Sequence, residues 1–341
     1  MLVKIKLVWM VFAAILLVGC AQKHQEGQSV EEQEVFSGEE ERIDTSSVYV
    51  ETAEIENINI EEEAEVLEEA LPAVPILLET EASGELEKRN EAAVIDYSNT
   101  SDGYVMVQYL QETANKLKVQ VKGTKTTYTY NLPAQKWVVF PLSDGNGNYQ
   151  VTVYENIEGN RYAMVLAESF SVELSDEFAP FIRPNQYVDY SEAEKTIQAA
   201  AKLVTGIEDT IQKVEKVYDF VVETISYDEE KARNVKSGYL PVLDEVMETQ
   251  KGICFDYAAL MTGMLRSQGI PCKLVVGYAG SSYHAWIHVW TEENGWVDGI
   301  IYFDSHSWHR MDPTFASSGG QSEEIMEYIG DGTNYTEKYL Y

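Results

Sequence analysis

The chain is long enough, at 341 residues, for two domains with additional tails. Its residues are 45% hydrophobic and include 22 Tyr, 10 Phe and 6 Trp, so sizeable cores are expected. The formal net charge is −32, and the sequence contains no cluster of Lys or Arg. Because neutralising phosphates requires basic clusters, we do not expect nucleic acid or another polyanion as a partner.

The first 20 residues have the organisation of a secretory signal. Two lysines precede a short apolar run that spans Leu7 to Val18. The run is short for a membrane-spanning helix, although an uncleaved anchor is the alternative. The Leu-Val-Gly-Cys sequence that ends at Cys20 resembles the lipobox of bacterial lipoproteins, which implies that Cys20 is diacylated. The protein would then be exported and held to the membrane by lipid, facing the extracytoplasmic side.

Residues 21–91 are rich in Glu, Gln, Ser and Ala and contain few aromatic residues. Such a segment cannot bury enough apolar surface to offset the entropy lost on ordering, so we predict an acidic, disordered tether. A short helix over Glu61–Ala70 is compatible with the sequence, and Pro72 would end it. A specific acidic interaction tail is the alternative to a simple spacer.

Residues 92–180 contain short runs rich in Val, Tyr and Thr, several of which alternate with polar residues. Turn sequences with Gly, Asn and Asp separate these runs. Short strands at this spacing predict an antiparallel, all-β sandwich-like domain, and we find no catalytic cluster in it. The expected strands are Tyr104–Leu110, Lys116–Lys122, Thr126–Asn131, Trp137–Leu142, Tyr149–Tyr154 and Tyr162–Leu174.

Helical patterns follow the strands. A capping-box sequence at Ser191–Glu194 predicts a helix that runs to Val204. A second helix is expected over Glu208–Ile225, where apolar residues recur at helical spacing. The chain then forms a loop that extends to Gly238, and a third helix is expected near Pro241–Thr249.

The segment Gly252–Pro271 predicts one helix with Gly269 near its end. Cys254 falls in the first turn, where the helix dipole and unpaired backbone N–H groups favour a thiolate and suit an oxyanion. A buried, inert thiol is the alternative for Cys254, and it is the expected state of Cys272. A disulfide between the two cysteines also stays open, because an exported protein meets an oxidising compartment.

Two strands follow this helix, over Lys273–Tyr278 and Tyr283–Thr291. In the second strand, His284 and His288 point to one face together with two tryptophans, because side chains alternate between faces along a strand. Four residues of strand separate the two histidines by about 13 Å. At most one of them can therefore lie beside Cys254.

Asp312 precedes Pro313 and so has a restricted, extended backbone, which suits a carboxylate that holds an imidazole in place. A metal hydrolase is a further alternative, with four histidines as the candidate ligands. These are His284, His288, His306 and His309. Strand spacing sets the first two too far apart to share one ion easily, so we expect neither a metal nor a cofactor.

Five motifs in this part of the chain resemble the bacterial transglutaminase-like superfamily and occur in the family's order. They are Gly252-Ile-Cys254-Phe-Asp-Tyr257-Ala, Gly269-Ile-Pro271 with Gly277-Tyr278, His284-Ala-Trp286, Gly295-Trp296-Val297 and Asp312-Pro-Thr314. The resemblance covers about Asp209–Phe315 and implies an α+β fold. In this fold a papain-like transglutaminase core over 185–318, with helices packed on an antiparallel sheet, follows the all-β sandwich-like domain.

The same resemblance assigns the nucleophile to Cys254, the base to His284 and the orienting acid to Asp312. The sequence departs from the family in two places. His288 stands where relatives often have Glu, and the stretch that leads to Asp312 is longer than usual. The second departure leaves Asp304 as a lesser candidate for the acid.

These features predict a cell-surface cysteine peptidase, amidase or protein-glutamine acyltransferase that acts through a thioester. Its substrate would be a protein or peptide, cell-wall peptide among them, and the sequence does not choose between water and an amine as acceptor. A non-catalytic binding or scaffolding module of the cell envelope is the alternative. Residues 319–341 are expected to form a tail that either wraps the domain, through anchors such as Tyr339 and Leu340, or stays disordered.

Overall fold

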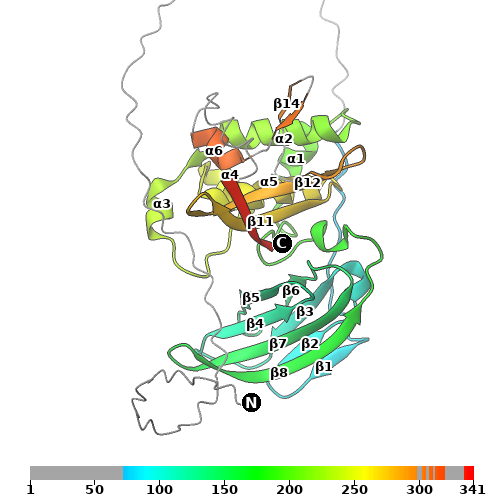
Figure 1. Cartoon of the computed structure of the whole chain (residues 1–341), viewed down its shortest axis with the longest axis vertical. Helices are drawn as coiled ribbons and strands as arrows, with labels where there is room; N and C mark the ends of the chain where they lie inside the picture. Colours follow the sequence, from blue (N-terminus) through cyan, green and yellow to red (C-terminus); the bar gives the residue numbers. More distant parts are fainter. Residues whose placement is uncertain (1–71, 298–301, 305–306, 310–311, 319–333) are drawn as a thin grey trace, which may run out of the picture.

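The computed structural model describes residues 72–297, 302–304, 307–309, 312–318 and 334–341. The predicted signal segment, Cys20, the short helix over Glu61–Ala70 and His306 lie outside these residues. Within the described residues, no helix has the length and apolar character needed to cross a membrane. The chain forms an all-β body and a mixed body of helices and strands, in that order (Figure 1).

The all-β body is a sandwich of two antiparallel four-stranded sheets. One sheet has the order β1-β2-β3-β6 and the other the order β5-β4-β7-β8. Valines that alternate along the strands, such as Val119 and Val121, are fully buried between the sheets. The strands of the first sheet are β1 (Glu87–Arg89), β2 (Ala93–Asp96), β3 (Tyr104–Tyr109) and β6 (Val138–Pro141). Those of the second are β5 (Thr127–Asn131), β4 (Leu117–Lys122), β7 (Gly147–Glu158) and β8 (Arg161–Val172).

The described part of the predicted tether is held against the fold. The Ala73 N–H donates to the Ala201 carbonyl at 3.3 Å, and the Ile76 N–H donates to the Ser267 carbonyl at 2.8 Å. Strand β1 then pairs with β2. The expectation of a disordered tether up to residue 91 therefore differs from the structure over residues 72–91. The prediction was based on the average composition of the whole acidic segment, which does not reveal a short apolar stretch that packs on the fold.

Six α-helices are present in the described residues, and three differ from the sequence expectations: α1 in its start and cap, and α3 and α6 because no helix was expected at either place. Helix α1 begins at Glu194, and the Asp244 carboxylate accepts from the N–H groups of Lys195 (3.1 Å) and Thr196 (2.9 Å), so the capping box at Ser191–Glu194 is wrong. Helix α3 lies in the predicted loop. The helices are α1 (Glu194–Leu203), α2 (Thr210–Thr224), α3 (Glu229–Asn234), α4 (Leu243–Thr249), α5 (Cys254–Arg266) and α6 (Pro313–Ser318).

The mixed body is built on an antiparallel sheet of order β13-β12-β11-β16. Its strands are β11 (Cys272–Ala279), β12 (Ser282–Thr291), β13 (Gly295–Val297) and β16 (Tyr335–Leu340). Paired residues such as Leu274 and Ile287 share one face and join the core, and every residue of α5 is buried beside them. Short pairs join β9 (Ser226–Tyr227) to β10 (Lys251–Gly252) and β14 (Tyr302–Asp304) to β15 (Ser307–His309). The α+β prediction, with helices packed on an antiparallel sheet, is confirmed.

The end of the chain belongs to this sheet. Residues 335–340 form β16, an edge strand antiparallel to β11, whereas the sequence suggested a tail that is either wrapped or disordered. Tyr339 and Tyr341 are buried, and the ring of Tyr341 lies 4.5 Å from that of Tyr187 and 5.8 Å from that of Tyr130. Since Tyr130 belongs to the sandwich, the two bodies share one continuous core.

Candidate active site

Cys254 is the first residue of α5 and is 3% exposed. The preceding Ile253 is extended, and its N–H donates to Oδ2 of Asp256 at 2.8 Å. Gly252 allows this turn, because a Cβ at that position would lie 2.6 Å from the Cβ of Asp256. The expected place of Cys254 in the first turn is therefore confirmed. The glycine at position 252 is explained by the lack of room for a side chain beside Asp256.

A partly buried ion pair stabilises the start of α5. Asp256 has no exposed surface, and its Oδ2 lies 2.8 Å from the Lys231 ammonium of α3. Its Oδ1 accepts from the Tyr239 hydroxyl at 2.5 Å. Sequence reasoning missed these groups, because Lys231 and Tyr239 come from a segment that was expected to be largely a loop. Together they fix the chain that precedes the thiol.

His284 lies on β12 and connects a carboxylate to the thiol. Its Nε2 is 2.5 Å from Oδ2 of Asp312. Burial lowers the pKa of His284, but the Asp312 carboxylate and Cys254 raise it through charge and hydrogen bonding, and the result is a pKa of about 10. Because Nε2 is engaged by Asp312, Nδ1 is the ring nitrogen that remains for the thiol.

Asp312 lies just before α6, has no exposed surface and is bound at both oxygens. Its Oδ1 accepts from the Thr314 N–H at 3.1 Å, and its Oδ2 accepts from the Tyr335 hydroxyl at 3.0 Å as well as pairing with His284. Asp304, the lesser candidate for the acid, lies in β14, and its side chain is outside the described ones. Asp312 is thus the predicted acid that the structure brings to His284.

His288 points to the same face of β12 as His284 but pairs with a different carboxylate. Its Nε2 lies 3.3 Å from Nε1 of Trp286 and 3.2 Å from Oε1 of Glu337. The expectation was that at most one of the two histidines lies beside Cys254. The structure pairs His284 with Asp312 and His288 with Glu337, and Trp286 contacts both rings. Glu337 comes from β16, so His288 faces a carboxylate supplied by another strand of the sheet.

Neither cysteine of the described chain is in a disulfide. The Cys272 thiol is buried 3.5 Å from Oγ1 of Thr262, and burial raises the pKa of Cys272 to about 11.

Among the described residues, no group of three or more His, Cys, Asp or Glu side chains is placed to hold a metal ion. His306 and the side chain of His309 lie outside that set.

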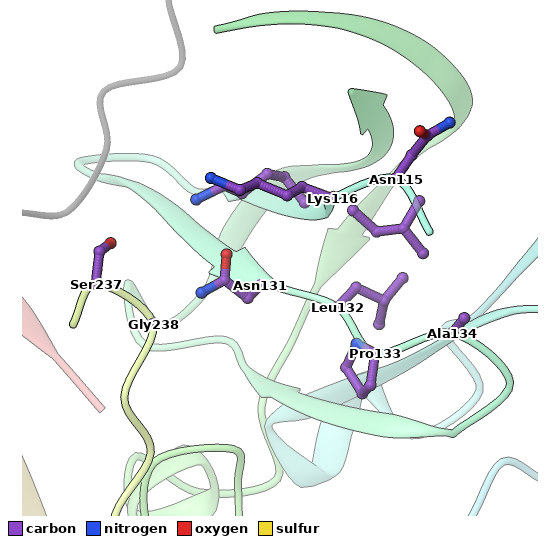
Figure 2. Close-up of a pocket in the computed structure, with 10 residues that line it drawn as sticks. Asn115, Lys116, Asn131, Leu132, Pro133, Ala134, Ser237 and Gly238 are labelled. Carbon is purple, nitrogen blue, oxygen red and sulfur yellow. The ribbon is translucent and has the colours of Figure 1, made fainter. Parts of the chain in front are cut away.

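A cavity of about 490 Å³ lies elsewhere, between the sandwich and the loop that precedes α4 (Figure 2). Lys116, Asn131 and Leu132 line it from the sandwich, and Ser237 and Gly238 close it from the loop. None of the three predicted catalytic residues lines this cavity. It is therefore separate from the cluster around His284.

Residues 197–298 match a family model described as the transglutaminase-like superfamily, a range that holds Cys254 and His284 but not Asp312. The chain is 26% identical to the uncharacterized protein YebA of Bacillus subtilis over 172 aligned positions, which cover 44% of this chain and 22% of that protein. It is 29% identical to a protein-glutamine gamma-glutamyltransferase of Pseudomonas aeruginosa over 98 aligned positions, which cover 25% of this chain and 13% of that protein. The chain thus matches less than a quarter of the length of either relative.

Among solved structures, the periplasmic domain of TgpA from Pseudomonas aeruginosa is similar over 70% of this chain and 77% of that chain, with 18% identity and a TM-score of 0.32. The match to the family model is the finding that assigns the domain, and the observed helices packed on an antiparallel sheet agree with it. This chain carries a domain of the transglutaminase-like superfamily over residues 197–298.

Proposed function

We propose that the protein is a cysteine hydrolase or acyltransferase in which Cys254 is the nucleophile, His284 the base and Asp312 the orienting acid. The observation that carries this proposal is the buried contact of 2.5 Å between Nε2 of His284 and Oδ2 of Asp312, beside a thiol at a helix start. The raised pKa of His284, about 10, keeps the imidazole protonated at neutral pH. A positive imidazolium next to Cys254 favours the thiolate.

The chemistry follows from these states. The Cys254 thiolate attacks the carbonyl carbon of an amide, and backbone N–H groups in the first turn of α5 stabilise the oxyanion. The imidazolium of His284 gives its proton to the nitrogen of the leaving amine, the C–N bond breaks, and a thioester remains. Water or a second amine then attacks the thioester while His284 takes up its proton, and the thiolate leaves.

The substrate class is a protein or peptide carboxamide, cell-wall peptide among them. The relative from Pseudomonas aeruginosa is named as a protein-glutamine gamma-glutamyltransferase, which supports an acyl-transfer reaction for this chain as well. Both acceptors are compatible with the geometry, because the same thioester precedes hydrolysis and transamidation.

Mass spectrometry of peptide and wall-fragment mixtures tests the proposal. Wild type and Cys254→Ala are each incubated with the mixture, with and without an added amine. A mass gain that needs the amine identifies a transferase, and simple cleavage identifies a hydrolase. A wild-type protein that leaves every peptide unchanged but retains wall fragments would contradict the proposal and favour a binding module.

We also propose that Cys20 carries the lipid that holds the protein on the extracytoplasmic side of the membrane. The basic start, the short apolar run and the Leu-Val-Gly-Cys sequence support this proposal. Growth with a labelled fatty acid should label the full chain in a bacterial host, and Cys20→Ser should not be labelled. Equal labelling of both chains would contradict it.

A further inference from the structure

The last strand of the chain contributes a side chain to the cluster around His284. The Tyr335 hydroxyl, at the start of β16, donates to Oδ2 of Asp312 at 3.0 Å. The same oxygen pairs with Nε2 of His284 at 2.5 Å. Tyr335 is therefore one hydrogen bond away from the imidazole, although it follows Asp312 by 23 residues in the sequence.

The ring of Tyr335 is held by the buried indole of Trp286. The two ring centroids are 5.1 Å apart and the planes meet at 71°, an edge-to-face contact. Trp286 has no exposed surface, and its ring stacks at 6.3 Å on that of His284. The positions of the base and of Tyr335 are thus set by one aromatic side chain between them.

The backbone of β16 is close to Trp286 because of Gly277 on the neighbouring strand. A Cβ on Gly277 would lie 2.1 Å from the Thr336 carbonyl oxygen and 2.9 Å from the indole. Farther along β16, Glu337 meets His288, and Tyr339 is buried in the core that the two bodies share. The strand is therefore fixed along its length, and Tyr335 has little freedom to leave Asp312.

We propose that Tyr335 is a positioning residue for the reaction, and that β16 is for this reason part of the active site. This inference rests on the proposed function of Cys254, His284 and Asp312. With Thr314 on Oδ1 and Tyr335 on Oδ2, the carboxylate is held on both sides and its Oδ2 points at the imidazole. Because the hydroxyl is a neutral donor, it fixes the carboxylate without cancelling its charge.

The test measures how fast iodoacetamide alkylates Cys254 in the full chain at neutral pH, in wild type, Tyr335→Phe, Asp312→Asn and the double variant. Tyr335→Phe keeps the ring against Trp286 and removes only the hydroxyl. Losing a hydrogen bond to a charged group should slow alkylation about tenfold. The matched control is Tyr278→Phe, which makes the same change on β11 and whose ring contacts Tyr283 rather than Asp312.

A double-mutant cycle separates positioning from a general structural effect. If Tyr335 acts through Asp312, Tyr335→Phe causes no further loss once Asp312 is Asn, and thermal unfolding shows that all variants are folded. The inference is overturned if the two losses multiply, or if Tyr335→Phe reacts as fast as Tyr278→Phe. If Asp312→Asn itself reacts as fast as wild type, the proposed function fails, which is a different result.

Discussion

His284 is buried between the Asp312 carboxylate and the Cys254 thiol, and this setting determines the charge of its imidazole. An imidazole with a pKa of about 10 is protonated at neutral pH, so His284 is an imidazolium that faces the Asp312 carboxylate. The proposed nucleophile therefore lies beside a positive charge before substrate binds. In the proposed reaction, this imidazolium–carboxylate pair raises the reactivity of Cys254.

The role of the acid can be tested by removing its charge. Asp312→Asn keeps the shape of the side chain but withdraws the charge that stabilises the imidazolium. We expect labelling of Cys254 by a thiol-reactive acyl probe to slow by about 100-fold. Asp304→Asn is the matched control and should be labelled at the wild-type rate. Slow labelling of Asp304→Asn together with wild-type labelling of Asp312→Asn would assign the acid to Asp304 instead.

The same ion pair predicts how stability depends on pH. The pKa of His284 rises from an ordinary value of about 6.5 in the unfolded chain to about 10 in the folded one. The stabilisation is therefore complete below about pH 6.5 and is lost as the pH rises through about 10. As the pH rises from about 6.5 to about 10, the melting temperature should fall less in His284→Gln than in wild type. Parallel plots of melting temperature against pH for the two proteins would contradict the ion pair.

Much of the site at this scale was predictable from the sequence. The helix-start position of Cys254, the alternation of β12 and the Asp-Pro sequence each have a local signal. Tyr335 has none, because an isolated tyrosine in a polar stretch gains its meaning only when β16 pairs with β11. Asp256 was overlooked for a similar reason, since its partner Lys231 is distant in the sequence.

The start of helix α1 is capped by a residue that is distant in the sequence. A capping box requires that the acceptor be near in sequence, and Ser191–Glu194 satisfies that pattern. In the fold, the carboxylate of Asp244, at the start of α4, accepts from the free N–H groups of α1 in place of a side chain near in the sequence. The helix was predicted correctly and its cap was not, because the cap is a tertiary contact.

The two candidate caps give opposite predictions. Asp244→Ala removes the acceptor for two N–H groups and for the Thr196 hydroxyl, so the free energy of unfolding should fall by about 1 kcal/mol. Ser191→Ala, the cap expected from the sequence, should change it by less than about 0.5 kcal/mol. Urea denaturation of both variants measures the difference, and a larger effect at Ser191 would contradict the structure.

The sandwich and the transglutaminase-like body are joined through aromatic side chains. Tyr130 of β5 lies 4.7 Å from Phe140, 5.5 Å from Tyr187 and 5.8 Å from Tyr341, measured between ring centroids. Composition and spacing predicted two architectures in the right order. They gave no sign of a common core, because each buried tyrosine fits the pattern of its own strand.

This shared core predicts that the two bodies unfold together. Calorimetry of the full chain should show one unfolding transition. Tyr130→Ala removes a ring that both bodies pack against, so the free energy of unfolding should fall by about 3 kcal/mol and the whole transition should move to lower temperature. Tyr154→Ala, at a partly exposed ring of the same sandwich, is the control and should shift it less. Two separate transitions, with only one moved by Tyr130→Ala, would contradict a common core.

In the proposed reaction, Cys254 forms a covalent acyl intermediate with the help of His284 and Asp312. Intact-mass measurement of the full chain after incubation with a thiol-reactive acyl probe would detect this intermediate. We predict one acyl adduct, located at Cys254, that is absent in Cys254→Ala and strongly reduced in Asp312→Asn. An adduct that persists in Cys254→Ala, or that forms equally on Cys272, would contradict Cys254 as the nucleophile.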